Sequence, residues 1–111
     1  MDTRKLIEEL YLCSATCDAC YKGCLEEADN DKLQRCMKLD KECLEICRLT
    51  GSLLEEDSEN TDKFLRLCVE ICNACAEECQ EHHHEHCQKC AAECRRCAEM
   101  CNEHLHHMEI R

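Results

Sequence analysis

The 111-residue sequence contains no proline and no tryptophan, and it has only one phenylalanine, two tyrosines and two glycines. Few residues are therefore present that would break a helix. With so few large side chains, an ordinary core of Leu, Ile and Phe would be thin. No stretch reaches the roughly 20 apolar residues that a membrane helix needs. The composition favours long helices with an unusual interior, and we expect no membrane partner.

The charge pattern excludes a second class of partner. The formal net charge is −11, and acidic and basic residues are mixed along the chain. A nucleic-acid surface needs a basic stripe, so we expect no nucleic-acid binding.

The first segment, MDTRKLIEELYLC, is charged and has no apolar run of signal-peptide length. We therefore expect a cytoplasmic location.

Sixteen cysteines are available to fill the interior in place of large apolar residues. In a secreted chain such a content indicates a disulfide scaffold, whereas in the cytosol it indicates metal binding or catalysis. The cysteines are spaced by three, four or seven residues inside four segments that have a helical pattern. We expect helices at approximately 3–28, 31–54, 61–80 and 85–107 within one domain, 1–111.

Short connections between these segments predict an all-α fold, an antiparallel up-down-up-down four-helix bundle. Spacings of three and four place the cysteines on the seam that faces the bundle axis, giving a cysteine-lined core. The candidate metal ligands are Cys13, Cys17, Cys20, Cys24, Cys36, Cys43, Cys47, Cys68, Cys72, Cys75, Cys79, Cys87, Cys90, Cys94, Cys97 and Cys101.

An internal repeat supports this arrangement. A shift of 55 residues places the cysteines of CSATCDACYKGC on those of CVEICNACAEEC, and a shift of 54 relates the second segment to the fourth. The repeat assigns a cysteine to position 40, but the residue there is Asp40. Asp40 is therefore predicted to face the core, where it either lines a metal site, pairs with a basic residue or stays protonated.

The two ends of the predicted bundle differ. Leucines and Phe64 gather at one end, where His104 and Met108 either extend the core or form a second entry. The segment EHHHEH lies at the other end, beside Cys24 and Cys87. Its histidines are either solvated or capture incoming metal.

Several interpretations of the thiols are possible. Packing alone fails on volume, because layers of cysteine would leave a channel unless something occupies it. Disulfides between residues four apart on a helix have unsuitable geometry, although bridges across the axis could form in a metal-free thiol redox protein. Zinc or another thiophilic metal could bind, but structural zinc sites are usually closed sets from loops.

Cu(I) fits the pattern better. It is soft, it is selected by thiolates, and two or three ligands suffice for each ion. With bridging thiolates the ratio approaches about one copper per cysteine. A single activated thiol with a partner base is not recognisable, so we expect no enzyme.

The repeated CxxxCxxCxxxC, together with LDKEC and HHHEHCQKC, closely resembles the copper storage proteins over nearly the whole chain. The resemblance implies a homotetramer of four-helix bundles, each filled with several cysteine-bound Cu(I) ions, and the absence of an export signal resembles the cytosolic branch. It also implies that Asp40, His82, His84 and His86 lie near an open mouth. The sequence thus predicts a cytosolic copper storage and buffering protein.

Overall fold

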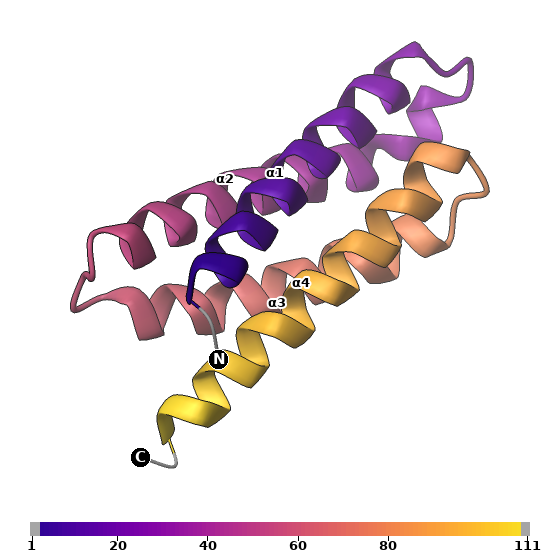
Figure 1. Cartoon of the computed structure of the whole chain (residues 1–111). Helices are drawn as coiled ribbons and strands as arrows, with labels where there is room; N and C mark the ends of the chain where they lie inside the picture. Colours follow the sequence, from indigo (N-terminus) through magenta and orange to yellow (C-terminus); the bar gives the residue numbers. More distant parts are fainter. Residues whose placement is uncertain (1–2, 110–111) are drawn as a thin grey trace.

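The computed structural model describes residues 3–109, with side chains over residues 3–107 (Figure 1). Within this part of the chain all regular structure is helical and no strand is present. The elements are α1 (Thr3–Glu26), the short 3-10 helix η1 (Asn30–Leu33), α2 (Gln34–Glu55), α3 (Thr61–Gln80) and α4 (Glu85–Glu109).

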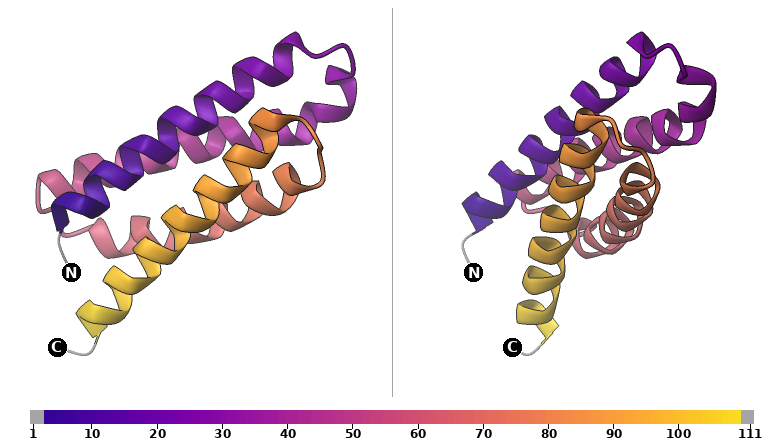
Figure 2. Two further views of the ribbon diagram at one scale, coloured as in Figure 1. Left: turned by 45° about the vertical axis from the view of Figure 1, so that its right-hand side comes forward. Right: turned by 90° about the vertical axis from the view of Figure 1, so that its right-hand side faces the viewer.

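Consecutive helices run in opposite directions, so the bundle is of the up-down-up-down type (Figures 1 and 2). Each helix contacts its two neighbours in the ring α1–α2–α3–α4, and α4 closes the ring against α1. The molecule is elongated, with dimensions of 49 × 21 × 19 Å. The α1–α2 and α3–α4 connections meet at one end, while the α2–α3 connection lies at the other (Figure 1). The predicted fold class is confirmed.

The connection between α1 and α2 departs from the sequence-based expectation. The pattern extends the first helix to residue 28 and starts the second at 31, but α1 ends at Glu26 and a 3-10 turn precedes α2. Local hydrogen bonds hold this turn, including one from the Lys32 amide to the Asp29 carbonyl at 2.9 Å. The side chain of Gln34 also donates to the Asn30 carbonyl. As a result, the turn between α1 and α2 is a defined structure at the same end of the bundle as the α3–α4 connection (Figure 1).

An apolar layer closes the opposite end. Leu6, Leu10 and Leu65 are fully buried there, and Phe64 packs against them while partly exposed. Thr50 is also fully buried, and its hydroxyl donates to the Ile46 carbonyl at 2.7 Å. Among the described helices, none is long and apolar enough to cross a membrane.

Candidate metal centre

The sixteen cysteines form a continuous column along the bundle axis. Every one of them lies within the described residues, is a free thiol and has a side chain with no exposed surface. Their helical spacing explains this placement, since residues three and four apart project from one face of a helix. We name this set of sixteen side chains the thiol column.

The thiol column divides into groups of potential metal ligands. In each group the ligand atoms, one per residue, all lie within 4.8 Å of one another. Five such groups are Cys20, Cys24, His86 and Cys87; Cys20, Asp40, Cys79 and Cys90; Cys17, Cys75, Cys90 and Cys94; Cys13, Cys17, Cys43 and Cys94; and Cys13, Cys47, Cys72 and Cys97.

Each of these groups shares at least one residue with the next. Cys20 belongs to the first two groups, Cys90 joins the second to the third, and Cys17 and Cys94 both join the third to the fourth. Cys13 then joins the fourth to the fifth. Isolated structural metal sites have closed ligand sets of their own. The sharing seen here is the arrangement that bridging thiolates require.

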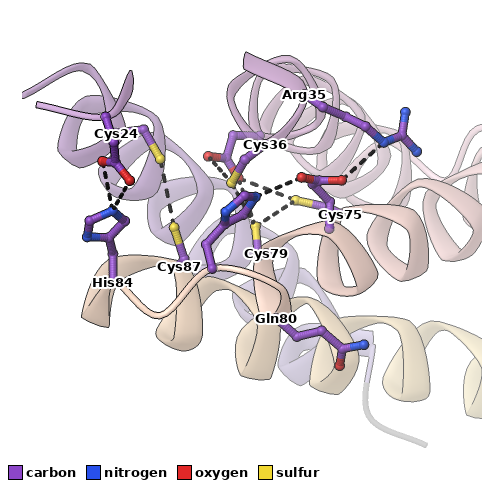
Figure 3. A network of polar contacts seen from close by, with 12 residues as sticks. Cys24, Arg35, Cys36, Cys75, Cys79, Gln80, His84 and Cys87 are labelled. Carbon is purple, nitrogen blue, oxygen red and sulfur yellow. Dashed lines mark hydrogen bonds and ion pairs between the residues drawn. The ribbon is translucent and has the colours of Figure 1, made fainter. Parts of the chain in front are cut away.

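Sulfur atoms of neighbouring helices are in contact inside the bundle. Cys36 and Cys79 are 3.3 Å apart (Figure 3). Cys17 and Cys94 are 3.6 Å apart, and Cys47 and Cys68 are 3.7 Å apart. Two thiolates bound to one ion at ~2.3 Å lie ~3.8 Å apart, so most of these spacings suit a shared ion. The helices accommodate the small side chains by approaching closely, and the channel expected from residue volumes is not seen between these sulfurs.

Asp40 lies within the thiol column and is fully buried. Its Oδ1 atom is 3.3 Å from the Cys90 sulfur, 3.4 Å from that of Cys75 and 3.7 Å from that of Cys79. Burial, followed by the charges of Cys90 and Cys36, raises the pKa of Asp40 to about 9. The carboxyl group therefore keeps its proton at neutral pH. These contacts favour lining of the column over the ion pair that the sequence left open.

His86 is the histidine that reaches the thiol column. Its Nδ1 atom lies 3.5 Å from the Cys87 sulfur and 3.8 Å from those of Cys20 and Cys24. The Nε2 atom points the other way and is 2.9 Å from Glu27 Oε2. A neutral imidazole held by a carboxylate on one nitrogen presents the lone pair of the other. His86 thus completes a set of one nitrogen and three sulfur ligands.

The other predicted histidines lie outside the thiol column. His84 is stacked on His86, and its two ring nitrogens face Asp29 at 3.1 Å and Glu27 at 3.3 Å. The Nε2 atom of His82 is 2.7 Å from Glu78, on the far side of the loop. Both side chains are mostly buried and are paired with these carboxylates, and neither has a contact with a described thiol.

We name the end of the column at Cys24, Cys87 and His86 the mouth. The two thiols of the mouth are protonated. Cys24 and Cys87 are 3.9 Å apart, on α1 and α4 (Figure 3). Burial is the main cause that raises the pKa of Cys24, and burial with the nearby Cys36 charge raises the pKa of Cys87 to about 12. A metal ion must therefore displace protons from these thiols when it binds.

The carboxylates that surround the histidines were not among the site residues predicted from the sequence. Glu27 and Asp29 are brought to the loop before α4 by the turn after α1, and Glu78 reaches His82 from the last turn of α3. Only the general acidity of these segments could have suggested them, because their positions depend on loop geometry. At the other end, His104 is half-buried on α4, and the side chain of Met108 lies outside the described residues.

Comparisons with known proteins agree with this geometry. The family model described as "Csp: Copper storage protein" matches residues 1–106. A Bacillus subtilis protein named "Uncharacterized cysteine-rich protein YhjQ" is 42% identical over 76 residues, covering 68% of this chain and 70% of that protein.

Two solved structures also match closely. Cu(I)-bound copper storage protein BsCsp3, the Bacillus subtilis Csp3, has a TM-score of 0.88 and 40% identity, covering 91% of this chain and 95% of that one. A cytosolic copper storage protein from Streptomyces lividans with five coppers has a TM-score of 0.90 and 35% identity, covering 93% and 91%. From the matched residues and the thiol column together, the chain belongs to the Csp family of copper storage proteins.

Proposed function

We propose that this chain stores and buffers copper, binding many Cu(I) ions in the thiol column. The observation that carries the proposal is the continuous series of ligand groups that share cysteines. A shared thiolate can bridge two ions, so a continuous series holds more metal than the same cysteines divided into separate sites. Each bound Cu(I) also offsets one thiolate charge, which limits the cost of burying ionised sulfur.

Cu(I) is the metal that best suits this ligand set. The donors are soft sulfurs in a site without exposed surface, and soft thiolates select Cu(I). The related proteins from Bacillus subtilis and Streptomyces lividans are described with bound copper. Zinc prefers closed tetrahedral sets, and it is the alternative cargo that the four-ligand groups would also accept.

We assign the ligand roles as follows. The sixteen cysteines hold the stored ions, and Asp40 lines the column one group below the mouth. His86 receives incoming ions together with Cys20, Cys24 and Cys87, whereas His82 and His84 form an outer layer bound to carboxylates. Of the four sequence-predicted ligands other than cysteine, this assignment keeps Asp40 and His86 as residues that line the column.

The cellular setting follows from the relatives. Because the Streptomyces lividans relative is described as cytosolic, we place this chain in the cytosol. We infer that residues 1–111 act as one unit that stores metal and does not catalyse a reaction, since all four helices contribute to one column of equivalent thiols. We also infer a homotetramer, as the resemblance to the family implies.

The test is an anaerobic titration of the fully reduced protein with Cu(I) and with Zn(II), each against a competing chelator. We expect roughly ten or more tightly held Cu(I) ions per chain, because bridging brings the ratio toward one ion per cysteine. Two or fewer Cu(I) ions would refute storage. Tighter and more numerous binding of Zn(II) would favour the zinc alternative, and thiols that oxidise without binding metal would favour the redox alternative.

A further inference from the structure

The ring of His86 lies between thiols of the column on one side and the carboxylate of Glu27 on the other. Its Nδ1 atom faces the thiols of Cys20, Cys24 and Cys87 at 3.5 to 3.8 Å, while its Nε2 atom is 2.9 Å from Glu27 Oε2. The imidazole is only part-exposed, so it cannot rotate freely without losing these contacts. Its orientation decides whether a nitrogen lone pair points into the column.

Glu27 selects the tautomer of this ring. An ionised carboxylate only accepts hydrogen bonds, so the short contact requires the proton of His86 to be on Nε2. The lone pair is then on Nδ1, the nitrogen that faces Cys24 and Cys87. Partners of this kind in the outer shell of a metal site fix both the tautomer and the ring orientation.

Gly23 provides the surface on which the ring rests. A Cβ atom added at Gly23 would lie 2.8 Å from both Cγ and Cδ2 of His86, and 3.1 Å from Nε2. Any larger residue would therefore push the ring away from α1. Glycine inside a helix is less favourable than alanine, so the close approach of the ring gives a reason for glycine here.

Gly23 lies in the last turn of α1, and Glu27 directly follows the end of that helix at Glu26, so both residues reach the ring of His86 from the same end of α1. The two contacts act on the same ring, one through shape and the other through a hydrogen bond. Glu27 also contacts Nδ1 of His84 at 3.3 Å, and His84 stacks on His86 with ring centroids 5.4 Å apart. The ring of His86 is thus restrained on several sides.

We infer that Gly23 and Glu27 are positioning residues that form a seat for His86, directing its Nδ1 lone pair toward the mouth so that it accepts the entering Cu(I) ion. This inference rests on the proposed copper storage function. The seat governs how fast the first ions are captured and not how many ions the column holds, because neither residue contributes a ligand to the thiol groups.

The experiment compares Glu27→Ala, Glu27→Gln and Gly23→Ala with the control Glu26→Gln, which removes one exposed charge beside Glu27. Reduced protein receives one equivalent of Cu(I) from a chelator complex in a stopped-flow instrument, and total capacity is measured separately. We expect Glu27→Ala and Gly23→Ala to slow capture roughly ten-fold or more. Glu27→Gln should recover much of the rate, because its amide oxygen still accepts from Nε2. Capacity should not change.

Two further measurements separate positioning from a general structural effect. Ring ¹⁵N shifts of His86 in the metal-free protein should report the Nε2–H tautomer in the wild type and a tautomer mixture in Glu27→Ala. In a His86→Ala background, Gly23→Ala should have no additional effect on the rate. Equal capture rates in Glu27→Ala and Glu26→Gln would contradict the inference that Glu27 positions His86. A low wild-type capacity would instead overturn the storage function itself.

Discussion

At the scale of single residues, Asp40 is the place where the internal repeat and the chemistry of the core diverge. The repeat assigns a cysteine to this position, and the structure places its carboxyl group among thiols with no exposed surface. Burial raises the pKa of Asp40 to about 9, so a proton remains on it at neutral pH. A neutral acid can be buried without a basic partner, which explains how the position tolerates the change.

This protonation makes the stability of the metal-free protein depend on pH. The pKa of Asp40 is raised on folding, from roughly 4 for an unperturbed aspartate to about 9. Its contribution to stability is therefore complete below pH ~4 and is lost as pH rises through about 9. Because an asparagine at this position does not titrate, the free energy of unfolding of Asp40→Asn should increase progressively relative to that of the wild type as pH rises from about 5 to about 9.

Urea unfolding of both reduced proteins at several pH values measures this difference directly. Subtracting the two curves removes the titration of the thiols that do not interact with Asp40, and leaves that of Asp40 and of the thiols coupled to it, such as Cys90 and Cys36. The half-exposed Asp18, paired with Lys22 at 3.0 Å, provides the control Asp18→Asn. A difference between wild type and Asp40→Asn that does not change with pH would contradict a protonated Asp40.

Some residue positions were predictable and others were not. Cysteine periodicity alone indicates that Cys13, Cys72 and their equivalents face inward, because helix geometry converts spacing into direction. No such rule applies to the loop before α4. Sequence could name His82, His84 and His86 as candidates, but the separation of His86 from the others depends on the turn after α1, which brings Glu27 and Asp29 to the loop.

At the scale of elements, a chain of polar contacts joins α2, α3 and the α3–α4 loop at the mouth end. Arg35 Nε of α2, labelled in Figure 3, is 3.2 Å from Glu78 Oε1 of α3. The other carboxylate oxygen of Glu78 is 2.7 Å from His82 Nε2. The side chain of Gln88 then donates to the His82 carbonyl at 2.6 Å. These contacts connect the mouth-end segments of α2 and α3 with the α3–α4 loop and with the first turn of α4.

Glu78→Ala should loosen this end of the bundle. Removing a mostly buried carboxylate with two partners should lower the free energy of unfolding by about 1 kcal/mol. Hydrogen exchange should increase at the end of α3, around Cys79 and Gln80, and remain unchanged near Leu65. Glu45→Ala breaks an exposed pair with Arg48 and serves as the matched control. Uniform exchange changes along α3 would contradict a local link.

At the scale of the whole molecule, the fold was the most predictable level. Strong helix periodicity, absence of proline and short connections leave few alternatives to an antiparallel bundle. The ends of the helices were less predictable, as the 3-10 turn before α2 demonstrates, because cap and turn geometry depends on local hydrogen bonds. The outer surface was least predictable, since neither repeat nor spacing constrains it.

That surface offers a contact region for the proposed homotetramer. Leu49 is 44% exposed on α2, and it lines a shallow groove with Ile46 and Ile71. Charged residues, including Lys41 and Arg48, surround these apolar side chains. An apolar centre with a polar rim is typical of protein interfaces.

Leu49→Glu should therefore weaken the assembly. Light scattering should give about four times the 13.0 kDa chain mass for the wild type and a lower mass for the variant. The control Leu67→Glu places the same charge at a leucine of similar exposure outside the groove. A tetramer that persists in Leu49→Glu at the same concentrations would contradict this location of the interface.

The closed apolar end gives the proposed store a direction. Leu6, Leu10 and Leu65 block one end of the thiol column, and His86 lies at the other. If ions enter and leave only past His86, the last ion in is the first ion out. The ions beside Cys24 and Cys87 then form an exchangeable pool, while those near Cys68 and Cys101 form a reserve that is released only after the others have gone.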